Sequence, residues 1–61
     1  MRIKIVTKTD NIYYISTPYH SLYELLKVVD RMTEDSFVYD DEIAVAKREI
    51  ESIKVVSKSW K

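Results

Sequence analysis

Few residues of this chain have the types and spacing that enzymes or metal sites require. His20 is the only histidine and the chain has no cysteine, so a metal site built from several nitrogen and sulfur ligands is not expected. A serine nucleophile would need an oriented base, and His20 is the only imidazole available. The chain also lacks glycine, which excludes the glycine-rich loops that hold nucleotide phosphates. We therefore expect no enzyme activity and no cofactor.

Carboxylates cluster at Asp40, Asp41 and Glu42. Hard divalent cations prefer clustered oxygen ligands, but this run lacks the spaced acids and the glycine of a calcium loop. We interpret the run as a solvated hairpin turn whose charge can contact a basic partner.

Aromatic residues are the most suggestive feature of the sequence, with five tyrosines, one phenylalanine and one tryptophan. We expect Tyr13 and Phe37 in the core. The others cannot all be buried in so small a domain, and exposed Tyr and Trp are residue types that anchor protein interfaces. Tyr14, Tyr39 and Trp60 are therefore candidate binding residues.

Basic residues suggest a second kind of surface. Lys4 and Lys8 alternate along a β-like segment and can share a sheet face with Tyr14, which Lys54 and Lys58 can extend. Small barrels bind single-stranded nucleic acid through such basic and aromatic faces. Against this use, the net charge of the chain is zero, whereas nucleic-acid-binding domains are usually basic.

The charge is nevertheless unevenly distributed. Residues 1–9 contain three basic and no acidic residues, whereas residues 24–42 contain seven acidic and two basic residues. Two oppositely charged poles favour oriented docking onto a charged partner.

The clearest secondary structure is a helix over Ser21–Thr33. Its apolar residues recur at the spacing of one helical face: Leu22, Leu25, Leu26, Val29 and Met32. Ser21 and Glu24 have the spacing of a capping box, in which Glu24 reaches back to the backbone N–H of Ser21. A face this apolar must pack on a sheet.

Two β-rich segments, 2–8 and 12–17, precede the helix and predict a hairpin. We favour a three-residue loop, Thr9–Asn11, with Asn11 in the left-handed conformation. This loop pairs Ile5 with Ile15 and Thr7 with Tyr13, and it puts Ile3, Ile5, Tyr13 and Ile15 on one face.

Residues after the helix fit two structures. Residues 41–57 have apolar residues at helical spacing, which would give the order β-β-α-β-α. The β-branched segment Ile53–Val56 instead favours strands, with Lys47–Glu49 as a one-turn corner, and the short strand Phe37–Tyr39 needs a neighbour. We therefore predict an α+β fold of order β-β-α-β-β-β, in which one helix packs across a single curled antiparallel sheet.

Residues 37–56, with a short strand, an acidic turn, an I-x-V strand, a one-turn corner and an I-x-x-I strand, resemble the closing strands of small SH3-like and Sm-like β proteins. They are also similar to short uncharacterised proteins of phages and low-GC Gram-positive bacteria. The resemblance covers about a third of the chain and implies a curled sheet, but no functional residue.

The length of 61 residues indicates one domain, 1–61. A core of this size rarely supplies more than about 3–5 kcal/mol of net folding stability, so formation of a homodimer is one way to gain stability.

A charged start without an apolar run indicates neither a secretory signal nor a membrane span, and a cytoplasmic location is the default expectation. From the surplus aromatics we predict a protein-interaction module, a binder, inhibitor or adaptor of phage type. The alternative is a nucleic-acid-binding small barrel.

Overall fold

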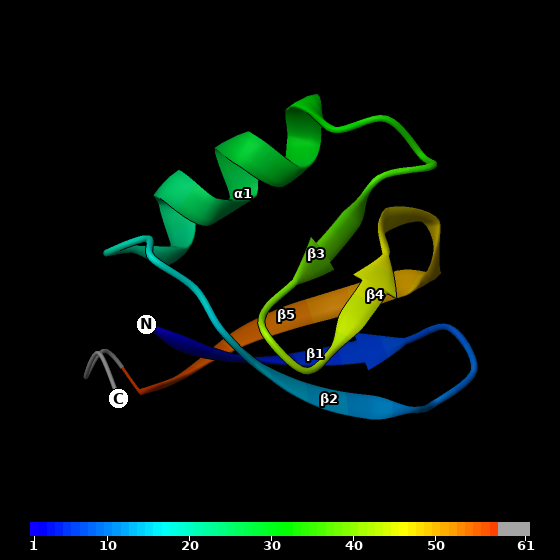
Figure 1. Cartoon of the computed structure of the whole chain (residues 1–61), viewed down its shortest axis with the longest axis horizontal. Coiled ribbons are helices and arrows are strands. Elements are labelled where there is room, and N and C mark those ends of the chain that lie inside the picture. Colours follow the sequence, from blue (N-terminus) through cyan, green and yellow to red (C-terminus); the bar gives the residue numbers. More distant parts are fainter. Residues whose placement is uncertain (58–61) are drawn as a thin grey trace.

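The computed structural model describes residues 1–57 (Figure 1). Two strands, β1 (Arg2–Thr7) and β2 (Ile12–Ser16), lead into the helix α1 (Leu22–Arg31). The strands β3 (Phe37–Tyr39) and β4 (Ala44–Ala46), a single 3-10 turn over Lys47–Glu49 and the strand β5 (Ile50–Ser57) follow. The predicted α+β fold and its element order are confirmed. Trp60, the third aromatic candidate, lies outside the described residues.

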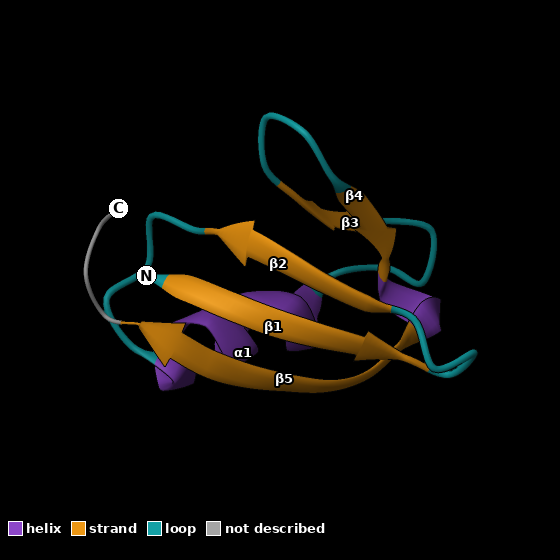
Figure 2. Ribbon diagram, turned by 90° about the horizontal axis from the view of Figure 1, so that it is seen from below, coloured by secondary structure: helices purple, strands orange, loops and turns teal. Residues whose placement is uncertain are grey.

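The strands form two antiparallel sheets where one curled sheet was expected. The larger sheet has the order β2-β1-β5, and β3 pairs with β4 in a separate hairpin. In Figure 2, α1 lies behind the β1 and β5 side of the larger sheet, and the β3-β4 hairpin lies beside β2. The helix and the hairpin together therefore cover one face of the sheet, and no other element within residues 1–57 covers the opposite face.

Alternation along β1 creates the core. Ile3, Ile5 and Thr7 are buried on the face that α1 covers, while Arg2, Lys4 and Val6 point to the other face. The full set of buried hydrophobic residues is Met1, Ile3, Ile5, Ile15, Leu25, Val38 and Val45. The core thus joins the sheet, the helix and the small hairpin.

The β1-β2 hairpin has the expected faces but a different register. Ile3 pairs with Ile15 and Ile5 with Tyr13, two residues away from the predicted pairing. The backbone N–H of Thr7 donates to the Asn11 carbonyl at 2.9 Å, and the Thr7 hydroxyl accepts the Asn11 N–H at 3.1 Å. These bonds close the loop around Lys8–Asp10, so Asp10, at φ 66°, occupies the left-handed position predicted for Asn11.

The predicted cap of α1 is half confirmed. The Ser21 hydroxyl accepts the backbone N–H of Glu24 at 3.2 Å. The Glu24 carboxylate, however, accepts the N–H of His20 at 3.5 Å, one residue before the expected donor.

The C-terminal end of α1 is capped from a distant part of the chain. The Lys47 ammonium donates to the Met32 carbonyl at 2.7 Å and to the Asp30 carbonyl at 3.4 Å. A cation at this end also opposes the negative pole of the helix dipole. We expect Lys47→Ala to lower the free energy of unfolding by about 1 kcal/mol, measured by urea denaturation. Lys27→Ala, on the exposed side of the same helix, is the control and should have a smaller effect.

The strand prediction for residues 41–57 is confirmed over its helical alternative, and the core position expected for Phe37 is wrong. The helical alternative for residues 41–57 is excluded by β4, the 3-10 turn and β5. Phe37 is 51% exposed, because in β3 the middle residue, Val38, points inward and its two neighbours point out. Within residues 1–57, no helix has the length and apolar character needed to cross a membrane.

Candidate functional site

The candidate site lies on the face of the β2-β1-β5 sheet that points away from α1, which we call the outer face. Figure 2 shows this face toward the viewer. Strand alternation and the strand register bring to it Arg2, Lys4, Val6, Ile12, Tyr14, Ser16, Ser52 and Lys54. Because these side chains stand on three hydrogen-bonded strands, their relative positions are fixed by the backbone ladder.

A basic and aromatic row crosses the middle of the outer face. Lys4 is paired with Tyr14 on β2 and with Lys54 on β5. Directly opposite residues on one face have their Cβ atoms about 5 Å apart, so the phenol ring has a lysine beside it and a second lysine one strand further on. Tyr14 is 43% exposed. The row therefore offers a flat ring and two ammonium groups to the same ligand.

Arg2 extends this row toward one end of the sheet. Its guanidinium carbon lies 5.9 Å from the centre of the Tyr14 ring, and its Nη1 donates to the Ser16 hydroxyl at 3.1 Å. A guanidinium held over a ring is attracted to the negative face of that ring. Tyr14 and Arg2 therefore keep each other in place, and Tyr14 is presented in a defined orientation.

The acidic turn between β3 and β4 borders the same end of the sheet. One carboxylate oxygen of Asp40, Oδ1, accepts the backbone N–H groups of Glu42 at 2.8 Å and Ile43 at 3.0 Å. The other oxygen, Oδ2, accepts the N–H of Ser16, on the open edge of β2, at 3.1 Å. Asp40 therefore fastens the small hairpin to the large sheet, and both of its oxygens are occupied.

These bonds also shift the titration of Asp40. The backbone N–H groups of Glu42, Ser16 and Ile43, and then the charge of Arg2, hold the pKa of Asp40 below its ordinary value of 3.8. Partial burial acts in the opposite direction and does not cancel them.

Replacement of Asp40 tests this anchor. Asp40→Ala leaves three N–H donors without their acceptor, and we expect it to lower the free energy of unfolding by about 2 kcal/mol. Asp41→Ala is the matched control, because the Asp41 side chain makes no hydrogen bond within residues 1–57, and it should stay within about 0.5 kcal/mol of the wild type. Equal losses in both variants, measured by urea denaturation, would contradict the anchor.

The pH dependence of the same variants follows from the lowered pKa. A carboxyl group with a lowered folded pKa stabilises the protein above its unfolded pKa and loses that effect as the pH falls through the folded pKa. The difference in unfolding free energy between the wild type and Asp40→Asn should therefore be larger at about pH 6 than at about pH 2.5. A difference that does not change over this range would contradict the shift.

A hollow of about 240 Å³ lies between the outer face and the acidic turn. Its lining residues are Arg2, Tyr14, Ser16, Asp40, Asp41, Glu42 and Ile43. Asp41 and Glu42 are exposed, so one side of the hollow is acidic while the basic row begins on the other side. The structure thus brings Tyr14 together with the three predicted acidic residues, and Lys4 is the neighbour of Tyr14.

Two other predicted site residues lie elsewhere. Lys8 follows the end of β1, in the β1-β2 loop and four residues along the chain from Lys4, and its backbone N–H donates to the Glu49 carbonyl at 2.9 Å. Tyr39 is 70% exposed and lines a separate apolar hollow of about 270 Å³ between β3 and α1, with Tyr19 and Val28. The eighth candidate, Trp60, falls outside the described residues.

Sequence reasoning missed Arg2 and Ser16 as members of the site. The correct hairpin register would have indicated both residues. In the structure Arg2 pairs with Ser16, which puts these side chains beside Tyr14, whereas the predicted pairing placed Ser16 opposite Lys4.

Within residues 1–57, no group of three or more His, Asp or Glu residues is arranged to hold a metal ion. Comparison of the chain with protein-family models, curated proteins and solved structures finds no match.

Proposed function

We propose that this protein is a small protein-interaction module that binds its partner through the outer face. The observation that carries the proposal is the uncovered row of Tyr14, Lys4 and Lys54, continued by Arg2. Aromatic residues and arginine are enriched in the energetically important centres of protein interfaces. A rigid sheet lowers the entropic cost of ordering such residues on binding.

The charges on the outer face define the kind of partner that fits. Lys4 and Lys54 favour carboxylates on the partner, and Tyr14, at the β2 end of the row, favours an apolar or planar side chain. Asp41 and Glu42, on the far side of the hollow, favour a basic group. A partner surface with an acidic centre, an apolar contact and a basic flank would dock in one orientation only.

The proposal includes no catalysis and no cofactor, as expected from the sequence. A role as a binder, inhibitor or adaptor of phage type in the cytoplasm belongs to the same proposal, and the lack of cysteine is compatible with a reducing compartment.

Single-stranded nucleic acid is the second candidate ligand, and the same row favours it. A ring with one lysine beside it and a second lysine one strand further on can stack a base and neutralise phosphates. The row offers one exposed ring, however, and the net charge of the chain is zero. Protein binding therefore ranks first.

Capture of partners on the immobilised protein, read by quantitative mass spectrometry, tests the proposal. Proteins that bind through the outer face should be retained by the wild type and by Tyr39→Ala, but lost with Tyr14→Ala. In parallel, fluorescence anisotropy with a short single-stranded DNA should show weak binding at low salt. Tight DNA binding that falls steeply with salt and is abolished by Lys4→Glu with Lys54→Glu would favour the second candidate instead.

A further inference from the structure

A second surface, remote from the acidic turn, is the open edge of β5. Within residues 1–57, β5 pairs only with β1. The bonds from Thr7 to Asn11 and from Thr17 to Met1 show that odd-numbered residues of β1 bond to β2, so its even-numbered residues bond to β5. Lys54 and Ser52, the partners of Lys4 and Val6, therefore point their backbone groups at β1. The N–H and C=O groups of Glu51, Ile53 and Val55 point away from the sheet.

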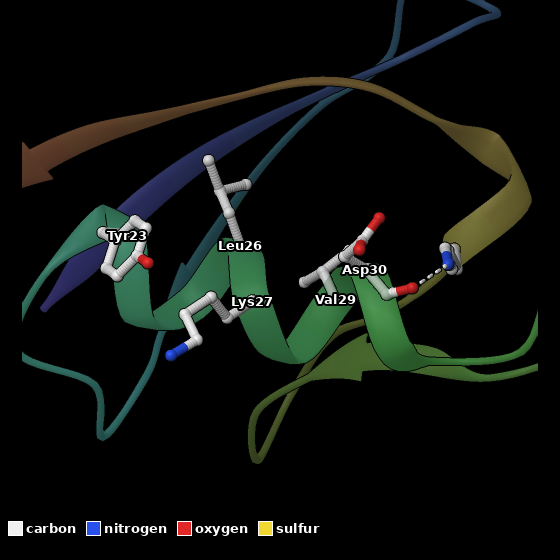
Figure 3. A pocket seen from close by; sticks show the side chains of 6 residues that line it. Tyr23, Leu26, Lys27, Val29 and Asp30 are labelled. Carbon is white, nitrogen blue, oxygen red and sulfur yellow. Dashed lines mark hydrogen bonds between the residues drawn. The ribbon is translucent and has the colours of Figure 1, made fainter.

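The flank of α1 above this edge is apolar and incompletely covered. Leu26 is 43% exposed and Tyr23 is 71% exposed, although both lie on a helix that packs on the core. Together with Lys27, Val29, Asp30 and Lys47 they line a hollow of about 430 Å³ (Figure 3). The figure shows Leu26 pointing from α1 toward the strands, and Lys47 donates to the Asp30 carbonyl at one end of the hollow. An open strand edge and an open apolar helix flank therefore face the same direction.

We infer that a second copy of this chain docks here and that the protein forms a symmetric dimer. β5 pairs with β5 of the second copy in antiparallel fashion about a two-fold axis at Ile53. The two β2-β1-β5 sheets then become one continuous sheet of six strands. The two-fold axis is perpendicular to that sheet, so both helices lie on the same side and Leu26 of each copy faces the other across the axis.

The sequence of β5 favours this pairing over a shifted one. With Ile53 opposite Ile53, Ser52 lies opposite Lys54 of the second copy, and no lysine is opposite a lysine. An axis at Lys54 would place two ammonium groups face to face, which is destabilising. The β1-β5 ladder is irregular near Val6 and near Arg2, so Ser52–Val55 is the regular stretch and Ile53 lies within it.

The helix flank is self-complementary in charge as well. Lys27 and Asp30 both line the hollow, one turn apart on α1. Because α1 runs antiparallel to its symmetry mate, Lys27 of one copy can approach Asp30 of the other. The zero net charge of the chain adds no repulsion between the copies. An unrelated extended peptide could also pair with the open edge of β5. It would not explain why both the β5 edge and the α1 flank are complementary to a second copy of themselves.

The spacing of the elements permits the contact. Paired strands lie about 4.8 Å apart, and helices pack at axial distances of about 8–10 Å. Since α1 lies over β1 and β5 (Figure 2), the two helices flank the new strand pair at a separation that Leu26 and Tyr23 can fill. Burial of these side chains in the dimer adds buried apolar surface, and therefore stability, to a domain whose own core is small.

Sedimentation equilibrium of the 61-residue chain tests the proposal. We expect the wild type to be a dimer at about 100 μM and Leu26→Glu to weaken the dimer at least about tenfold, because it buries a charge in an apolar contact. Phe37→Glu is the matched control, since Phe37 is 51% exposed and lies on the small hairpin, and it should remain dimeric. A monomeric wild type, or a dimer that Phe37→Glu breaks and Leu26→Glu does not, would overturn the proposal.

Disulfide cross-linking tests the register without touching the core. In Ser52→Cys with Lys54→Cys, oxidation should give a covalent dimer, because residue 52 faces residue 54 of the second copy. Lys54→Cys alone should not, because the two copies of residue 54 are diagonal neighbours about 7–8 Å apart, beyond disulfide reach. Cross-linking of the single variant with equal yield would contradict the axis at Ile53. Lys54 also belongs to the row on the outer face, whereas Leu26 and Phe37 do not. The Leu26→Glu and Phe37→Glu variants therefore tell failure of the dimer apart from failure of the outer-face proposal.

Discussion

Ile5→Ala should leave most of the protein unfolded in the absence of a partner. Ile5 is 0% exposed and occupies the middle strand of the sheet, paired with Tyr13 and Ile53. Truncation of a buried isoleucine costs about 2–5 kcal/mol. A core of this size rarely provides more than about 3–5 kcal/mol in total, so the substitution removes most or all of the stability. Circular dichroism and urea denaturation measure the effect.

Ile12→Ala is the control for this prediction. Ile12 is the same residue type in the neighbouring strand, but it lies on the outer face and is 52% exposed. Its truncation should cost less than about 1 kcal/mol. If both variants lost similar stability, the assignment of the two sheet faces would be wrong, because it requires one isoleucine to be covered by α1 and the other to be open.

The second large effect concerns binding by the outer face. For a partner obtained in the capture experiment, Tyr14→Ala should raise the Kd at least about 30-fold, equivalent to about 2 kcal/mol, as expected for a central aromatic anchor. Lys4→Glu with Lys54→Glu should weaken binding by a similar or larger factor, since it puts like charges opposite an acidic partner. Isothermal titration calorimetry measures both.

Matched variants separate this effect from general damage. Tyr39→Ala removes an exposed tyrosine from the β3 side, and Glu34→Lys reverses an exposed charge in the loop after α1. Both leave the outer face intact, and both should keep the Kd within about threefold of the wild type. Loss of affinity in Tyr39→Ala with none in Tyr14→Ala would move the binding surface to the hollow between α1 and β3.

The main features of the fold could be predicted from local patterns. Alternation of apolar residues in β1 identifies its buried face, and the helical spacing from Leu22 to Met32 identifies α1. The corner at Lys47–Glu49 and the inward Val55 also follow from the sequence. In each case the element is long enough for its residue pattern to indicate both whether it is a helix or a strand and which of its residues face the core.

Features that depend on contacts between elements could not be predicted in the same way. The hairpin register shifted by two residues because the Thr7 hydroxyl closes the loop through Asn11, and such a shift leaves the faces unchanged. In the three-residue strand β3, alternation is too short to fix its phase, so Phe37 was assigned to the wrong side. The role of Asp40 depends on an edge N–H 24 residues away in sequence, at Ser16.

Part of the candidate site could be predicted from the sequence. Tyr14, Lys4 and the acidic turn were named from residue type, and the structure places Tyr14 between Lys4 and the turn. Lys8 was predicted at the end of the first strand, but β1 ends at Thr7 and Lys8 lies in the loop. The helical periodicity groups Leu26 with the buried residues, so the sequence did not indicate that Leu26 is partly exposed in the structure.

Photo-crosslinking is the most direct test of the central claim that the outer face is the binding surface. A photoreactive benzoyl-phenylalanine replaces either Ile12, on the outer face, or Phe37, on the small hairpin. The two sites have nearly equal exposure, 52% and 51%, and Ile12 lies on β2, away from the β5 edge. The proposal predicts partner adducts from position 12 and none from position 37. Adducts from position 37 alone would contradict it.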